Sequence, residues 1–339
     1  MAEPGRAYLE AYLAPILPML SRADVTDIFI NRPGEIWIEA VGGAIERHDA
    51  PELDEKHLWR LAEQVASLSH QGINREHPLL SATLPDGARV QIVAPPATRG
   101  TIAIAIRRNV TAGFSLADYR TSGAFDRTAT EPSAPAADGR IAASHAERDF
   151  AALLRRAVLS RKTILVSGGT SSGKTTFLNA LMREIPAGER LIFIEDAPEL
   201  VPVHANLVGL VATRGALGEA RVTTDELLQA ALRMRPDRII LGEIRGAEAL
   251  TFLKAVNSGH PGSLTTVHAD GPARAVEQLA LLCLQAGTRL RYEDVVRYVV
   301  SVVDLYVHLH RVDGRRQVAN ICGRDDLCAS LAPQHPTNA

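Results

Sequence analysis

The chain has 339 residues, with 37 Lys and Arg against 39 Asp and Glu, and a formal charge of −2 at pH 7. At roughly 100–200 residues per domain, this length predicts two domains. A hydrophobic fraction of 46% and a charged fraction of 22% exclude a collagen, a wholly disordered chain and a disulfide-rich miniprotein. The near-neutral charge argues against a protein that coats nucleic acid, so we expect no stable nucleic-acid binding.

The cysteines and the N-terminal segment indicate where the protein works. Cys283, Cys322 and Cys328 are odd in number and lack C-x-x-C spacing, which favours a reducing cytosol over a disulfide framework or a zinc site. The apolar stretch 13–20 is interrupted by prolines and makes a poor signal peptide. No uncharged apolar run approaches the roughly 20 residues that span a bilayer, so we expect a cytoplasmic protein.

The first 120 residues predict a compact α+β domain. Apolar residues alternate in short runs separated by turn residues, which is typical of half-buried strands. A longer segment has apolar residues at helical spacing, with Asp54 in position to be its N-cap and Gly72 in position to be its C-cap. The predicted strands are 25–30, 35–38, 88–93 and 101–107, and the predicted helix is 54–71.

A change of composition follows this domain. Residues 127–148 are rich in Ala, Pro, Ser and Asp, and we interpret 121–147 as a flexible linker. Strands and helices then alternate through a second domain, 148–325, which predicts a mostly parallel sheet covered by helices on both faces. The tail 326–339 is expected to be disordered. The predicted helices are 148–160, 174–185, 224–234, 247–257 and 272–285, and the strands are 163–167, 190–195, 238–242 and 263–267.

The first strand of the second domain leads into a phosphate-binding motif. Residues 168–176 match G-x-x-x-x-G-K-[ST] between a β-branched strand and an apolar helix. Glycines allow backbone N–H groups to surround phosphate oxygens, Lys174 can reach the β and γ phosphates, and Thr175 can bind Mg²⁺. The predicted nucleotide-binding residues are Gly168, Gly169, Thr170, Ser171, Ser172, Gly173, Lys174, Thr175 and Thr176, with ATP and Mg²⁺ as the ligands.

Acidic residues and a histidine follow three later strands. Glu195 and Glu243 each follow an apolar strand, at the edge where open α/β sheets bind ligands. We expect these two acids to share two roles, orienting the attacking water and completing the metal shell. The sequence leaves open which acid has which role. His268 follows a further strand and is expected to sense the γ-phosphate, whereas His260 precedes a Pro-Gly turn and can instead hold a loop.

With these four motifs in this order, the chain resembles members of the type II/type IV secretion ATPase family, and within that family the TrbB-like conjugal-transfer branch. The resemblance rests on the phosphate loop, residues 194–199, residues 240–245 and the segment from Gly259 to His268. It is weaker over the N-terminal domain, through 84–89 and 104–108. It implies a RecA-like P-loop ATPase domain joined to the smaller α+β domain.

The same resemblance implies function and partners. It implies a hexameric cytoplasmic ATPase that is peripheral to the inner membrane, contacts inner-membrane components and powers pilus biogenesis and substrate transfer. Nucleotide would lie between the two domains, where arginines neutralise γ-phosphate charge. The arginine candidates are Arg89, Arg107, Arg108 and Arg245.

Other functions remain open at this level. A pilus retraction or assembly motor of the same family is one alternative, and a nucleotide-gated scaffold with little turnover is another. A DNA translocase is disfavoured by the neutral charge and by an aromatic content of 4%. A small-molecule kinase is disfavoured because no segment resembles an acceptor-binding lid.

Overall fold

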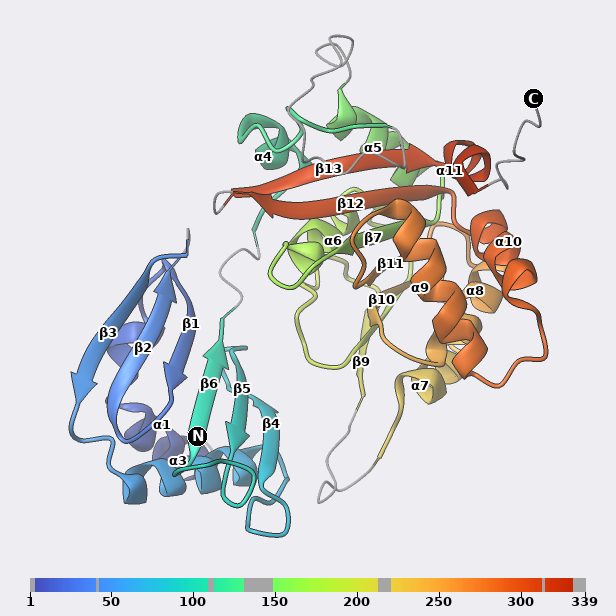
Figure 1. Cartoon of the computed structure of the whole chain (residues 1–339). Coiled ribbons are helices and arrows are strands. Elements are labelled where there is room, and N and C mark those ends of the chain that lie inside the picture. The colour runs from blue at the N-terminus through green and yellow to red at the C-terminus, as the bar shows by residue number, and fades with distance from the viewer. Residues whose placement is uncertain are drawn as a thin grey trace, which may run out of the picture. The chain divides into compact units, whose positions relative to one another are not determined.

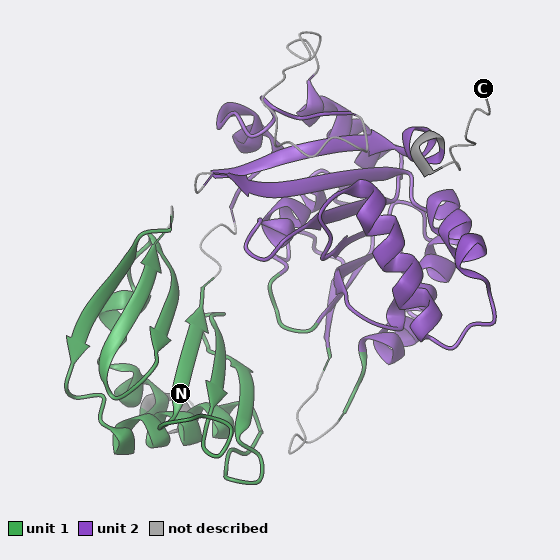
Figure 2. Ribbon diagram, in the orientation of Figure 1, with its two compact units in different colours: residues 1–111, 196–199, 212–223 green, residues 112–195, 200–211, 224–339 purple. Residues whose placement is uncertain are grey.

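The computed structural model describes residues 4–40, 43–108, 113–130, 149–212, 221–312 and 315–331. The chain forms two compact units (Figure 2). Unit 1 comprises Met1–Thr111, Asp196–Glu199 and Ala212–Thr223, and unit 2 comprises Ala112–Glu195, Leu200–Val211 and Thr224–Ala339. Among the helices in these ranges, none is long and apolar enough to cross a membrane.

Unit 1 is an antiparallel sheet in the strand order β3-β2-β1-β6-β5-β4, packed against helices (Figure 1). Alternate apolar residues such as Ile28, Ile38 and Ile104 bury one face of the sheet with Leu9 and Leu58 of the helices. The elements are α1 (Pro4–Leu13), α2 (Leu17–Leu20), β1 (Val25–Ile30), β2 (Gly34–Ala40), β3 (Ile45–Ala50), α3 (Glu55–Leu68), β4 (Leu79–Thr83), β5 (Arg89–Val93) and β6 (Ala103–Arg107).

Helix α3 confirms the predicted helix but corrects its end. Asp54 Oδ1 accepts a hydrogen bond from His57 N at 2.7 Å, as an N-cap does. The helix ends at Leu68, and His70 adopts a left-handed conformation with φ of 51°. Gln71 N then donates to Ala66 O at 2.8 Å, which closes the helix end. The assignment of Gly72 as the C-cap was therefore wrong, because His70 takes the left-handed position earlier in the chain.

Unit 2 is a seven-stranded sheet in the order β13-β12-β7-β11-β10-β8-β9. All neighbouring pairs are parallel except β12 with β13, which form an antiparallel hairpin. The strands are β7 (Ile164–Gly168), β8 (Leu191–Glu195), β9 (Leu207–Val211), β10 (Arg238–Ile244), β11 (Leu264–Val267), β12 (Leu305–Val312) and β13 (Arg315–Gly323). The helices are α4 (Leu116–Thr121), α5 (Phe150–Leu159), α6 (Lys174–Met182), α7 (Thr224–Leu232), α8 (Glu248–Asn257), α9 (Pro272–Gln285), α10 (Tyr292–Val302) and α11 (Arg324–Leu331).

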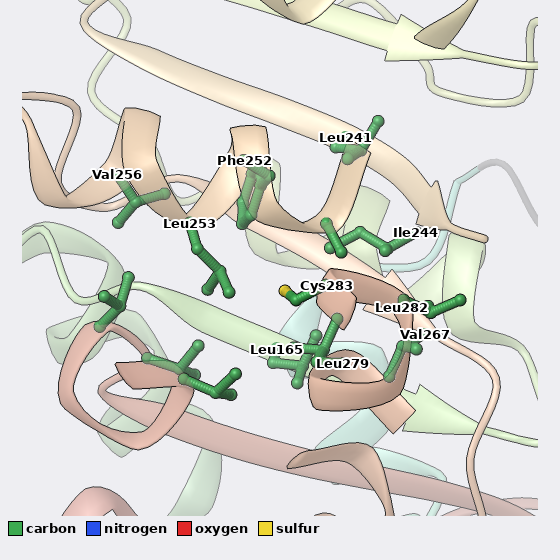
Figure 3. Packing of buried hydrophobic residues seen from close by; sticks show 14 of the residues in the cluster. Leu165, Leu241, Ile244, Phe252, Leu253, Val256, Val267, Leu279, Leu282 and Cys283 are labelled. Atoms are coloured by element: carbon green, nitrogen blue, oxygen red, sulfur yellow. The ribbon is translucent and has the colours of Figure 1, made fainter. Parts of the chain in front are cut away.

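Helices cover both faces of this sheet. Leu165, Leu241 and Val267 face one core with α8 and α9, where the Cys283 side chain points into the cluster (Figure 3). The alternate strand residues Ile164 and Ile240 face a second core with α4, α5 and α6. The predicted α/β architecture is therefore confirmed, because both faces of the central strands are apolar.

Several elements of unit 2 differ from expectation. Strands β9, β12 and β13 and helices α4, α10 and α11 were not predicted. The expected disordered tail begins inside α11, where Leu327 is fully buried. At the start of the expected linker, Thr128 is also buried, and its hydroxyl donates to Val318 O at 2.7 Å. Residues 131–148, which hold most of that linker, lie outside the described residues.

The amino edge of the unit 2 sheet is held by a buried arginine. Arg238 is fully buried and donates to Glu189 through Nε at 2.8 Å and Nη2 at 2.9 Å. Its Nη1 donates to Val158 O at 2.8 Å. Gly262 leaves room for it: a Cβ there would lie 2.7 Å from Arg238 Nη1 and 2.9 Å from Arg161 Cα. The His-Pro-Gly segment therefore has a packing role at this edge.

We expect Gly262→Ala to destabilise unit 2 by about 1–3 kcal/mol, because the glycine has φ of +81° and its surroundings have no space for a methyl group. The urea unfolding midpoint measures the effect. Gly188→Ala is the matched control, since no atom lies within 4 Å of its Cβ position. Equal midpoints for the two variants would contradict the packing role.

Candidate nucleotide-binding site

The phosphate-binding motif forms a tight loop between β7 and α6. Gly168 ends β7, and a Cβ there would lie 2.6 Å from Leu309 O of β12 and would collide with the Ser172 hydroxyl. Gly173 precedes the helix with φ of 94°, a left-handed conformation that favours glycine. The geometry therefore requires glycine at both positions, and it places the loop at the N-terminus of α6.

Lys174, the first residue of α6, lies inside the loop. Its Nζ donates to Gly168 O at 2.9 Å and to Gly169 O at 3.2 Å. The same Nζ lies 3.4 Å from Glu243 Oε1, and the Lys174 side chain is 11% exposed. The ammonium group is thus held between the phosphate loop and the acid of β10.

Glu243 is held by two cations. Besides Lys174, Arg245 Nε donates to Glu243 Oε2 at 2.6 Å. Burial alone would raise the Glu243 pKa, but the Lys174 charge and the Arg245 contact outweigh it, so the pKa lies below its ordinary value. Glu243 is therefore ionised at neutral pH. Arg245 is placed by this contact beside Glu243.

Glu195 ends β8, the strand next to β10. Ile194 is paired with Leu241, so Glu195 lies at the level of Gly242, immediately before Glu243. Its side chain is buried, and Oε1 accepts a hydrogen bond from Leu200 N at 2.7 Å. The backbone amide thus fixes the orientation of this carboxylate.

Strand β11 lies between β7 and β10 and carries the histidine region. Thr266 Oγ1 donates to Gly242 O at 2.8 Å, which ties β11 to the strand of Glu243. His268 follows the end of β11 and is exposed. The structure therefore brings Lys174, Glu195, Glu243 and His268 to the carboxyl ends of four adjacent strands, β7, β11, β10 and β8.

Two residues close in sequence to the motif strands lie at the other edge of the sheet. His260 precedes β11, and its Nδ1 lies 3.0 Å from Ala255 O at the end of α8. Asp237 precedes β10 and accepts a hydrogen bond from Arg190 N at 2.7 Å. Both residues therefore have structural roles. For His260 this agrees with the alternative left open by the sequence, that it holds a loop.

His308 on β12 belongs to this region but escaped the motif analysis. Its Nδ1 lies 3.1 Å from Ser167 Oγ, directly before the phosphate loop. Burial, together with the charges of His310 and Lys174, lowers the His308 pKa to about 4. The alternation of apolar and polar residues over 305–312 was the one signal that could have revealed this strand.

The arginine candidates of unit 1 have different orientations. Arg89 of β5 and Arg107 of β6 are directly opposite in the antiparallel register, so they share one face of the sheet. Arg107 Nε lies 3.9 Å from Asp27, and Arg89 pairs with Glu199 of the same unit. Arg108 instead donates to the carbonyl oxygen of Val25 at 3.3 Å and to that of Arg22. These hydrogen bonds hold the Arg108 side chain against the backbone of unit 1.

The loop residues fit a bound phosphate chain. Ser172 Oγ is buried and has no hydrogen-bond partner within the described part of the chain, and burying an unpaired hydroxyl costs about 1–3 kcal/mol. The described residues include no cluster of three or more His, Cys, Asp or Glu that could hold a metal. One hydroxyl from Thr175 and one carboxylate from Glu243 suit Mg²⁺, which keeps waters and binds substrate phosphates.

A buried neutral histidine makes stability depend on pH. The folded state keeps the His308 pKa at about 4, below its ordinary 6.5, so the unfolded chain binds the proton more readily. This contribution is complete above about pH 6.5 and is lost as pH falls towards 4. We expect His308→Gln to show a smaller drop in urea midpoint between pH 7 and pH 5 than the wild type. An unchanged drop would assign the pH dependence to other groups.

Comparison with known proteins places the chain in a family. A family profile described as "Type II/IV secretion system protein" matches residues 10–322. The type IV secretion system protein VirB11 of Brucella suis is 42% identical over 97% of this chain and 94% of its own length. PtlH of Bordetella pertussis is 39% identical over 97% of this chain and 99% of its own.

A solved structure agrees on the fold. The pilus retraction motor PilT, with bound ADP, has a TM-score of 0.59 at 19% identity and covers 95% of this chain and 86% of its own. This likeness confirms the α/β fold class with a RecA-like domain and a smaller α+β domain. The family profile and the two secretion relatives confirm the resemblance drawn from the motifs, and the chain therefore belongs to the type II/type IV secretion system protein family.

Proposed function

We propose that this chain is an ATPase that hydrolyses ATP to power a type IV secretion machine. The observation that carries the proposal is the line of Lys174, His268, Glu243 and Glu195 along four adjacent strand ends. A phosphate loop next to the ionised Glu243 and to a second acid, Glu195, can hold a nucleotide and direct water onto its γ-phosphate. The names of the VirB11 and PtlH relatives support secretion as the process that uses this energy.

The contacts support separate roles for the two acids. Glu243 lies against Lys174 Nζ, so we assign it to the Mg²⁺ shell together with Thr175. When bound, Mg²⁺ neutralises charge on the β and γ phosphate oxygens. Glu195 lies one strand further away and is fixed by Leu200 N, so we assign it to orienting the attacking water. His268, on the strand between the loop and Glu243, is assigned to sensing the γ-phosphate.

The two acids should fail in different ways when changed. We expect Glu195→Gln to lower kcat at least about 10²-fold while leaving the Mg²⁺ requirement unchanged, because only water orientation is lost. Glu243→Gln should lower kcat and raise the Mg²⁺ concentration needed for half-maximal ATP binding. Phosphate release and nucleotide binding across a Mg²⁺ titration distinguish them. Identical Mg²⁺ curves for both variants would contradict this division of roles.

The arginines of unit 1 supply a second positive site. Arg89 and Arg107 lie directly opposite each other on antiparallel strands, and each side chain is partly exposed, at 39% for Arg89 and 46% for Arg107, with Glu199 and Asp27 as their respective carboxylate neighbours. Two guanidinium groups on one face can exchange such neighbours for the oxygens of a multiply charged anion. We propose that Arg89 and Arg107 bind the γ-phosphate of ATP, and that Arg108 has a structural role in unit 1 because it holds two backbone carbonyls.

We expect Arg89→Ala and Arg107→Ala each to lower kcat by about 10²-fold or more while ADP affinity stays the same, because ADP lacks the phosphate that they bind. Arg60→Ala is the matched control, since Arg60 is exposed on helix α3. Steady-state phosphate release and ADP titration provide the measurements. A comparable loss of ADP affinity in either variant would rule out γ-phosphate recognition.

Assembly and location complete the proposal. We infer a homo-hexamer in the cytoplasm, peripheral to the inner membrane and bound to inner-membrane components of the secretion apparatus. The family of the chain supports this arrangement, and the names of the two secretion relatives favour secretion over a pilus retraction motor. Membership of the TrbB-like branch stays a prediction. A nucleotide-gated scaffold would bind ATP tightly with negligible turnover.

A further inference from the structure

The hairpin of β12 and β13 places an arginine on the phosphate loop. Arg316 of β13 lies so close to Gly173 that a Cβ on the glycine would be 2.9 Å from Arg316 Cδ and 3.3 Å from its Nε. The alkyl part of Arg316 therefore covers the last residue of the loop. The positive charge of Arg316 lowers the pKa of the Tyr119 phenol on α4, but burial outweighs this effect and raises that pKa to about 12. Arg316 is half-buried at this position.

The sheet order shows which end of a nucleotide this arginine would meet. Strand β7, which leads into the loop, has β11, β10 and β8 on one side and β12 and β13 on the other. Lys174 contacts Glu243 on the first side, where the γ-phosphate is expected. Arg316 lies on the opposite side. A phosphate chain that crosses the N-terminus of α6 would therefore turn its α-phosphate towards Arg316.

The charges around Gly173 point to an anion as well. Arg316 lies beside the N-terminal end of α6, which carries a partial positive charge, and the next residue is Lys174. Backbone N–H groups at a helix N-terminus bind phosphate oxygens, and a positively charged side chain beside them strengthens that binding. A guanidinium fork matches phosphate oxygens better than a point charge does, so arginine suits this position.

We propose that Arg316 binds the α-phosphate of the nucleotide and sets the affinity for both ATP and ADP. This inference rests on the proposed function of the loop as a nucleotide site. It assigns the C-terminal hairpin to substrate binding, a role distinct from that of Arg89 and Arg107. Those arginines would recognise the γ-phosphate and hence ATP alone, whereas Arg316 acts on a group that both nucleotides share.

Equilibrium titration of ADP and of ATP with Mg²⁺, on the full chain, tests the proposal with Arg316→Met, Arg316→Ala and Arg316→Lys. Methionine keeps an apolar stem over Gly173 but removes the charge. We expect Met and Ala to raise the Kd for ADP and ATP by the same factor, about 10-fold or more, and Lys to recover part of the loss. Arg315→Ala is the matched control, because Arg315 is exposed and, as the neighbour of Arg316 on the strand, points to the opposite face of the sheet.

Three outcomes would overturn the proposal. Wild-type affinity in Arg316→Met would show that the side chain only packs on the loop. A loss of affinity for ATP but not for ADP would place the Arg316 side chain at the γ-phosphate. An equal loss of affinity in Arg315→Ala would show that the effect comes from the net charge of the hairpin and not from a contact with the nucleotide. Failure of the proposed function looks different: the wild type and a Lys174→Ala variant would then bind ADP and ATP equally weakly.

Discussion

The contact between Lys174 and Glu243 is the interaction on which the rest of the site depends. The lysine begins α6, directly after the phosphate loop, and the acid lies near the end of β10, with β11 between their strands. Only the parallel register of β7, β11 and β10 brings the two groups to 3.4 Å. The pair keeps Glu243 ionised despite its partial burial and holds the ammonium group within the loop. The chemistry of the site therefore follows from the sheet that supports it.

The two edges of that sheet have separate tasks. At the carboxyl edge, charged groups lie next to a loop that requires glycine at two positions, and they can act on a ligand. At the amino edge, the buried Arg238 is fully paired with Glu189 and backbone carbonyls, and Gly262 provides the space that it needs. A buried charge of this kind is tolerated because its hydrogen bonds are satisfied. The histidine region reaches both edges, since His260 lies at the amino edge beside the Arg238 contacts and His268 lies at the carboxyl edge beside the phosphate loop.

Local patterns predicted the elements that carry the motifs, because the phosphate loop and the acidic strand ends are contiguous in sequence. Side-chain direction could not be predicted in the same way. Arg107 and Arg108 are neighbours in sequence, and only the register of β5 with β6 shows that Arg107 faces Arg89 while Arg108 contacts the backbone. His308 and Arg316 were missed because β12 reaches the loop through long-range pairing with β7, and β13 reaches it through its hairpin with β12. The end of α3 differed because His70 adopts a left-handed conformation that glycine was expected to supply.

Phosphate release from ATP, measured per chain across a range of protein concentrations with Mg²⁺, tests most directly whether this sheet edge is a motor site. The wild type should show turnover that rises with concentration as protomers assemble. Lys174→Ala should show none, whereas Lys254→Ala, which removes an exposed lysine of α8, should retain wild-type turnover. Turnover that is equal in the wild type and in Lys174→Ala would contradict a hydrolytic role for the loop and for the ion pair beside it.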